Sequence, residues 1–167
     1  QSLFRRYGCS SADHNTVLVD GLVQKRNAPK TARKPIDAKF VSNEEFDYAQ
    51  SSYNDTFCAP DFNGDNPKTV LTKPAVHTRE IRFCKPDFFC VVDTLKSSDG
   101  KPHDYELRFQ LNTCKTRKTD IYPQAVLSDF DGNKYDILIL PLCTEQLEIS
   151  TATGRTSPYM AGWFIGR

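Results

Sequence analysis

The chain has 167 residues, of which 38% are hydrophobic and 26% are charged, a length and composition suited to one soluble domain with a sizeable core. Its 22 Lys and Arg nearly balance 21 Asp and Glu, giving a net charge of +1, so no overall field draws it to nucleic acid or to an anionic membrane. No run approaches the roughly 18 consecutive apolar residues of a membrane-spanning helix. We therefore expect a single domain over residues 1–167, with no nucleic-acid and no membrane partner.

The first predicted strand begins at Asp13, within the stretch SADHNTVLVDG. Side chains alternate between the two faces of a strand, which places Val17 and Val19 on the core face and His14 on the other. His14 and Asp20 share that outer face, but six residues at about 3.3 Å each put them roughly 20 Å apart. These two side chains therefore cannot share a metal ion.

A basic surface loop or an edge excursion is predicted for residues 24–40, where two prolines and six Lys or Arg residues break the strand pattern. Lysine and arginine side chains in such a loop can pair with an acidic ligand, and aromatic side chains can stack on its rings. The candidate substrate-binding residues are Lys25, Arg26, Tyr48 and Tyr53, with Phe57 as a further loop aromatic. A second exposed basic run is expected at 115–118.

Short β-branched or aromatic runs, separated by turn residues, continue along the rest of the chain. They are HTREIRFC, DFFCVVDTL, HDYELRFQLNT, DIYPQAVLSDF, KYDILILPL, EQLEIST and YMAGWFI. Tight hairpin turns favour Asp-Gly steps, and these occur at Asp20-Gly21, Asp99-Gly100 and Asp131-Gly132. Many strands about 8 to 12 residues apart, with no helical periodicity between them, predict an all-β fold in the form of an antiparallel β-sandwich.

The run HTREIRFC places two charged or titratable side chains, His77 and Arg79, at the start of a row that continues with Ile81 and Phe83. Ile81 and Phe83 are expected to be buried. A histidine and an arginine at the start of such a row usually form hydrogen bonds to loops or pair with a carboxylate such as Asp93.

The run that begins at His103 has the same alternation. Its apolar row is predicted to face the core and its polar row to face outward, with His103 at the edge of the strand. The apolar row is Tyr105, Leu107, Phe109 and Leu111, and the polar row is Glu106, Arg108 and Gln110.

The six cysteines show no CxxC spacing, which excludes a zinc ribbon and a redox pair of that type. Cys84 and Cys90 stand in or beside strand runs, where a small buried thiol is expected. Disulfides between Cys9 and Cys58 or between Cys114 and Cys143 stay open, because pairing cannot be read from sequence.

Known catalytic motifs are absent from the sequence. The segments DFNGD and DFDGN lack the spaced glutamate of an EF-hand and are interpreted as turns. There is no GxSxG motif and no phosphate-binding glycine loop. The residues by themselves describe a β-sandwich without its own active site, so no catalytic residue is predicted.

Three segments, in order, carry a family resemblance: HNTVLVDG, VHTREIRFCKPDFFCVVDTL and HDYELRFQL. Together with FDYAQSSY they resemble the β-sheet portion of heparinase II/III-like polysaccharide lyases, over most of residues 8–112. In that family an (α/α) toroid precedes the sandwich and supplies the residues that abstract the C5 proton of a uronic acid and expel the 4-linked sugar. The resemblance implies a C-terminal sandwich that supports the toroid and lines the substrate cleft, without catalysis of its own.

The resemblance also implies the setting of the chain. Its partners would be an acidic polysaccharide, such as a glycosaminoglycan, and its own upstream toroid, in a bacterial periplasm or outside the cell. His14 is similar to a family histidine that binds one divalent metal, zinc or calcium, near the junction of the domains. Since a stable zinc site needs about three protein ligands, we expect no metal on the isolated chain.

Two other functions stay open at this point. The chain could be a carbohydrate-binding module that uses the basic loop and the loop aromatics. It could also be a non-catalytic secreted structural sandwich.

Overall fold

The computed structural model describes most of the chain as two compact units, residues 1–108 and 109–167. The described residues are 7–25, 36–59, 69–111, 113, 115–119, 122, 124–129, 135–142, 145–155 and 161–162. The expected single domain over residues 1–167 stays a prediction.

All strand pairings in the described residues are antiparallel, so the predicted all-β antiparallel class is confirmed. The first unit contains the 3-10 helix η1 (Ser11–Asp13) and strands β1 (Val17–Val19), β2 (Val23–Gln24), β3 (Ile36–Ser42), β4 (Phe46–Tyr53), β5 (Phe57–Cys58), β6 (Val70–Leu71), β7 (Ala75–Cys84), β8 (Phe88–Ser97) and β9 (Tyr105–Leu107). The second contains β10 (Thr116–Lys118), β11 (Val126–Ser128) and β12 (Leu138–Ile139). No helix among the described residues is long and apolar enough to cross a membrane.

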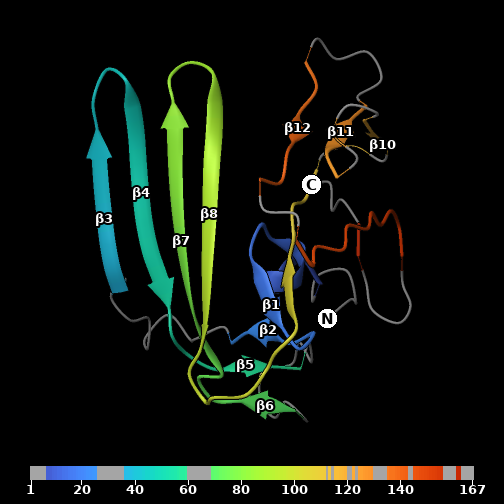
Figure 1. The fold of residues 1–167 in the computed structure, drawn as a ribbon. Coiled ribbons are helices and arrows are strands. Elements are labelled where there is room, and N and C mark those ends of the chain that lie inside the picture. Colours follow the sequence, from blue (N-terminus) through green and yellow to red (C-terminus); the bar gives the residue numbers. More distant parts are fainter. Residues whose placement is uncertain are drawn as a thin grey trace. The chain divides into compact units, whose positions relative to one another are not determined.

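The largest sheet of the first unit has four strands in the order β3-β4-β7-β8, which form two long hairpins side by side (Figure 1). Strand β4 pairs with β7 from Tyr53 opposite His77 to Phe46 opposite Cys84. The two hairpin turns meet at the far end of the sheet, where the backbone N–H of Lys85 donates to the carbonyl of Glu45 at 3.0 Å. The pairing thus extends along the full length of both hairpins.

Strands β3 and β4 differ from the sequence prediction. The predicted loop at 24–40 ends in β3, and the aromatics expected in loops lie in strands instead: Tyr48 and Tyr53 in β4, and Phe57 in β5. Ile36, Ala38 and Phe40 alternate with polar residues, as in a half-buried strand, yet β3 is exposed along its whole length. Pairing with β4, rather than burial, makes this segment a strand.

The outer half of the four-stranded sheet keeps apolar side chains exposed. Ile81 is 37% exposed and Phe83 is only half-buried, so the prediction that both belong to the core was wrong. Phe40 and Phe89 are 73% and 66% exposed. The hairpins extend away from the buried cluster of the unit (Figure 1), which explains why the same strand is buried at Ala75 and exposed at Ile81.

The buried cluster of the first unit lies around β1, β5 and the β1–β2 turn. Its members are Val19, Leu22 and Phe57, with Tyr53, Ala59, Leu71 and Tyr105 packed against them. All three residues of β1 are buried, including Leu18 at 2% exposure. The predicted alternation of the first strand was therefore wrong, because a strand covered on both faces has no solvent side.

The first strand also begins later than predicted, at Val17 instead of Asp13. The hydroxyl of Ser10 accepts a hydrogen bond from the N–H of Ala12 at 3.1 Å and caps the short helix η1. Serine is a preferred N-cap because its side chain satisfies a backbone N–H at the helix start. This local turn takes the residues before His14 out of the strand.

The turn between β1 and β2 confirms the predicted Asp-Gly hairpin. Asp20 and Gly21 have φ angles of 51° and 70°, the left-handed pair that a tight two-residue hairpin requires. The backbone groups of Val19 and Leu22 exchange hydrogen bonds of 3.2 and 2.9 Å across it. Gly100, after Asp99, is likewise left-handed at 73°.

The alternation predicted for the run after His103 holds only at Tyr105, which packs against the buried cluster. Leu107 is 45% exposed, whereas Arg108 is only 8% exposed. The guanidinium of Arg108 donates to the carbonyl of Ala12 at 2.9 Å and to Glu106 at 2.8 Å. These bonds allow a charged side chain to occupy a buried position.

The described cysteines carry free thiols. Cys9 is exposed, and Cys58, Cys84 and Cys90 are half-buried. A bond between Cys9 and Cys58 is therefore absent, and Cys84 and Cys90 are less buried than expected. Residues 114 and 143, the segment DFNGD and the Asp131-Gly132 step lie outside the described residues.

In the second unit, β11 and β12 lie within the predicted runs DIYPQAVLSDF and KYDILILPL. The basic run at 115–118 is exposed, as expected, and includes β10. The run EQLEIST contains no strand, and most of YMAGWFI lies outside the described residues.

Candidate functional site

The HNT segment, which we define as His14 to Thr16, connects the helix η1 to β1. The N–H of His14 donates to the carbonyl of Ser11 at 3.2 Å, and the N–H of Thr16 donates to the carbonyl of His14 at 2.9 Å. The imidazole of His14 is exposed, with Nδ1 at 2.8 Å from the carbonyl oxygen of Asp13. The structure thus presents His14 at the surface, as the sequence indicated.

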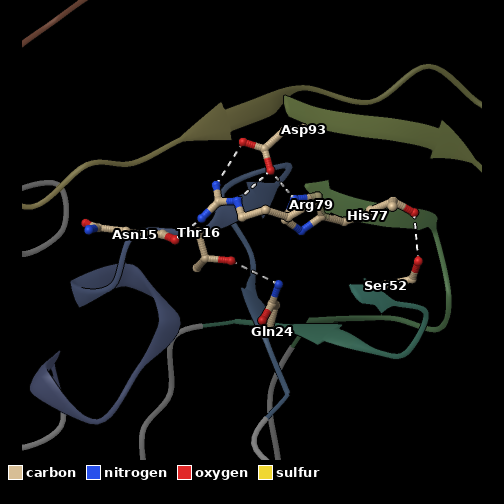
Figure 2. Close-up of polar contacts among 8 residues, drawn as sticks. Asn15, Thr16, Gln24, Ser52, His77, Arg79 and Asp93 are labelled. Atoms are coloured by element: carbon tan, nitrogen blue, oxygen red, sulfur yellow. Dashed lines mark hydrogen bonds and ion pairs between the residues drawn. The ribbon is translucent and has the colours of Figure 1, made fainter. Parts of the chain in front are cut away.

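A buried ionic cluster on β7 and β8 lies against the HNT segment (Figure 2). Arg79 and Asp93 are direct cross-strand neighbours. Arg79 donates to both carboxylate oxygens of Asp93, from Nε at 2.7 Å and from Nη2 at 2.9 Å. His77 Nε2 donates to the same carboxylate at 2.6 Å. The predicted pairing of His77 and Arg79 with Asp93 is confirmed.

The Asp93 carboxylate is the centre of this cluster. Its side chain is only 3% exposed. Burial opposes its ionisation, but the hydrogen bonds from His77 and Arg79 outweigh burial and hold the pKa of Asp93 below its ordinary value. The carboxylate is therefore charged and paired near neutral pH.

Arg79 joins this cluster to the HNT segment. While Nε and Nη2 bind Asp93, Nη1 donates to the backbone carbonyl of Asn15 (Figure 2). A guanidinium presents its donors in a rigid planar fork. The carboxylate that fixes the plane of Arg79 therefore also fixes the position of the Asn15 carbonyl.

Further bonds fix Thr16, the last residue of the HNT segment. Gln24 Nε2 donates to the hydroxyl of Thr16 at 3.2 Å, and the N–H of Arg108 donates to the carbonyl of Thr16 at 2.9 Å. The N–H of Gln24 also donates to the hydroxyl of Ser11 at 2.9 Å. Residues from β2, β7 and the end of β9 thus hold the backbone around the exposed His14.

No metal site is formed within the described part of the chain. Among those residues, no group of three or more His, Cys, Asp or Glu side chains could hold a metal ion. Zinc needs about three protein ligands, so a metal on His14 would take its other ligands from elsewhere. The metal role of His14 stays a prediction.

The candidate substrate-binding residues are not brought together. Tyr48 and Tyr53 are five positions apart on β4 and so point to opposite faces of the sheet. The hydroxyl of Tyr48 donates to Glu80 at 2.8 Å, and that of Tyr53 donates to the carbonyl of Thr56 at 2.7 Å. Lys25 is exposed after β2, and residue 26 lies outside the described residues. Their role in substrate binding stays a prediction.

An exposed aromatic cup, absent from the sequence-based candidates, lies on the outer half of the four-stranded sheet. It has a volume of about 260 Å³ and is lined mainly by Phe40, Ala49, Ile81, Phe83 and Phe89, with Asp47 at its rim. The rings of Phe83 and Phe89 stack with centroids 4.4 Å apart.

The sequence also did not reveal the environment of His103. It was expected at a strand edge, but its side chain is only 4% exposed and lies between the carboxylates of Asp20 and Asp99. Both aspartates belong to predicted Asp-Gly turns. The sequence thus contained the turns but not the fact that they meet around this ring.

Comparison with known proteins identifies the family. A family model described as "Heparinase II/III-like, C-terminal" matches residues 1–147, a range that contains the HNT segment and the cluster around Asp93. No curated protein and no solved structure matches the chain. The match confirms the resemblance carried by the HNTVLVDG and HTREIRFC segments, and the chain belongs to the Heparinase II/III-like, C-terminal family.

Proposed function

We propose that the chain is the C-terminal β-sheet domain of a polysaccharide lyase that cleaves uronic-acid glycans by β-elimination. In this role it supports an upstream (α/α) toroid and lines one side of the substrate cleft, without catalysing the reaction alone. The observation that carries the proposal is the family match over residues 1–147. The lyase would act in a bacterial periplasm or outside the cell, where such glycans are found.

The geometry of the HNT segment supports this proposal. A buried ionic cluster holds the backbone carbonyl next to His14, while the His14 ring itself remains exposed. A segment that is rigid and yet presents a histidine outward is suited to contact a neighbouring domain or a bound glycan. This placement, together with the family membership, supports the proposed cleft role.

Binding of acidic glycan by the chain alone tests this proposal. In native gels with heparin in the matrix, migration of the chain should slow, whereas an uncharged dextran matrix should have no effect. Lys25→Glu should weaken the retardation, because Lys25 is exposed beside the predicted basic loop. Lys96→Glu on β8 is the control with the same charge change. Equal migration in heparin and dextran, or equal effects of the two variants, would contradict the glycan role of this surface.

We further propose that His14 contributes one ligand to a divalent metal, zinc or calcium, in the full-length lyase. Metal analysis after dialysis against zinc should give much less than one zinc per isolated chain, since a lone histidine is a poor site. One tightly bound zinc per chain that disappears in His14→Ala would show that the other ligands lie within this chain.

The aromatic cup supports a second candidate function, a carbohydrate-binding surface. Phe40 and Phe89 are the most exposed of its rings, and aromatic faces on a sheet offer flat apolar platforms for the C–H face of a pyranose. Asp47 at the rim accepts from Lys85 Nζ at 2.8 Å and from the Ser42 hydroxyl at 2.6 Å. These polar groups are placed to bind sugar hydroxyls.

Two neighbouring phenylalanines give a matched test of the cup. Phe89 lines it, whereas Phe88 is 59% exposed and points to the opposite face of β8. In titrations with an uncharged oligosaccharide followed by NMR, Phe89→Ala should abolish the shifts and Phe88→Ala should leave them unchanged. Shifts that persist in Phe89→Ala, or none in the unmodified chain, would exclude the cup as a sugar site.

A further inference from the structure

His103 lies between two carboxylates that belong to two different turns. Its Nδ1 is 2.7 Å from Asp20 Oδ2, in the β1–β2 turn, and its Nε2 is 3.0 Å from Asp99 Oδ1, in the segment after β8. The His103 side chain is only 4% exposed, although the carboxylates themselves reach solvent. The ring therefore connects segments that are 83 residues apart in the sequence.

The two contacts require the charged form of the ring. An ionised carboxylate can only accept hydrogen bonds, and a neutral imidazole has a single N–H. Only the imidazolium donates to both Asp20 and Asp99. Tyr105 on β9 is a further titratable neighbour, with its ring centroid 6.3 Å from that of His103. The hydrogen bonds to Asp20 and then Asp99 raise the pKa of His103 above its ordinary value.

The contact between His103 and Asp20 closes one end of the pairing between β1 and β9. Asp20 and Asp104 form a backbone hydrogen bond of 2.8 Å, and Asp20 Oδ1 accepts from the N–H of Asp104 at 2.9 Å. The strand pairing then continues from Val19 opposite Tyr105 to Val17 opposite Leu107.

At its other end the same pairing reaches the HNT segment. The N–H of Arg108 donates to the carbonyl of Thr16 at 2.9 Å. Because the pair has only three residues in each strand, the bonds at Asp20, Asp104 and Thr16 belong to one short ladder, and opening one end leaves few bonds to hold the other.

We propose that His103 is a pH-sensitive latch: as an imidazolium it holds β9 against β1, and loss of its proton opens this end and loosens the HNT segment. In the neutral ring one nitrogen presents a lone pair to a carboxylate oxygen, so that contact changes from attractive to repulsive. The latch does not depend on the proposed glycan-binding function.

The direction of the pH effect follows from linkage. A group with a raised pKa in the folded state stabilises that state fully below its unfolded pKa, about 6.5 for histidine. The stabilisation is lost as the pH rises through the higher folded pKa. The latch is therefore closed in mildly acidic solution and opens in alkaline solution.

NMR titration of the full chain tests the protonation of the latch. The ring resonances of His103, assigned by their loss in His103→Gln, should titrate above the ordinary histidine pKa. Asp99→Asn should lower that pKa, because one of the two accepting carboxylates becomes neutral. Asp104→Asn is the charge-matched control, since Asp104 contacts Asp20 through its backbone. An ordinary or lowered pKa, or equal effects of the two variants, would overturn the proposal.

Amide exchange in the same protein tests the opening. After correction for base catalysis, the amides of Asp20, Asp104 and Arg108 should lose protection as His103 deprotonates. The amide of Ile81, in the long β7–β8 pairing, should stay protected over the same range. Unchanged protection at Asp20 and Asp104 through the titration of His103 would show that the ring is no latch.

Discussion

Asp93 shows how one buried carboxylate organises a candidate site. Its two oxygens accept three hydrogen bonds from His77 and Arg79, and Arg79 extends the connection to the carbonyl of Asn15. A buried ion pair is weak support for stability as a whole, but removal of one partner leaves the other buried and unpaired. The effect of a single substitution is therefore expected to be large.

Asp93→Asn should destabilise the chain by about 3 kcal/mol, the lower end of the cost of breaking a buried ion pair. An amide keeps the volume of the side chain but cannot neutralise Arg79. Urea unfolding measures this free energy. Asp87→Asn, at the exposed β7–β8 turn, makes the same chemical change at the surface and should cost little. Equal losses for the two variants would contradict the central place of Asp93.

The lowered pKa of Asp93 predicts a pH dependence in acid. Because the unfolded state protonates at a higher pH, about 3.9 for aspartate, the carboxylate contributes its full stabilisation above that pH. The contribution is lost as the pH falls through the lower folded pKa. The free energy of unfolding is measured from about pH 6 to about pH 3, an interval that spans the ordinary aspartate pKa. It should fall less steeply in Asp93→Asn than in the unmodified chain. Parallel curves for the two proteins would disprove this linkage.

At the scale of elements, the sequence predicts strands best where long β-rich runs pair with near neighbours. β7 and β8 were found in this way, together with the pairing of Arg79 and Asp93. The start of β1 was missed because Ser10 caps a local helical turn. The exposure of Ile81 could not be predicted, since it depends on which part of the sheet lies near the buried cluster.

The candidate site was only partly predictable for the same reason. The exposed position of His14 and the partners of His77 follow from local pattern and charge. The environment of His103 does not, because two turns far apart in the sequence meet around its ring. The aromatic cup also depends on register, which brings Phe40 and Ile81 to opposite sides of Ala49.

The β1–β2 turn gives a prediction at the scale of an element. Gly21 has a φ of +70°, and a Cβ added there would meet no atom within 4 Å. Gly21→Ala should therefore destabilise the chain only through backbone conformation, by about 1 to 2 kcal/mol. Gly21→Asn should cost less, because asparagine tolerates the left-handed region. Thermal unfolding compares the two, and a larger loss for asparagine would contradict this account of the turn.

At the scale of the whole molecule, the family match includes all of the first unit and extends into the second. The residues that surround the HNT segment all lie in the first unit. The family match is the observation behind the proposed supporting role in a lyase.

The most direct test of this role is a turnover measurement. The chain is incubated with a uronic-acid polysaccharide such as heparin, and the unsaturated product of β-elimination is followed by its ultraviolet absorbance. A lyase that carries this domain behind its (α/α) toroid serves as the positive control. Product is expected from the lyase and none from the chain alone. Product formed by the chain alone would contradict the supporting role, because the catalytic residues would then lie within these 167 residues.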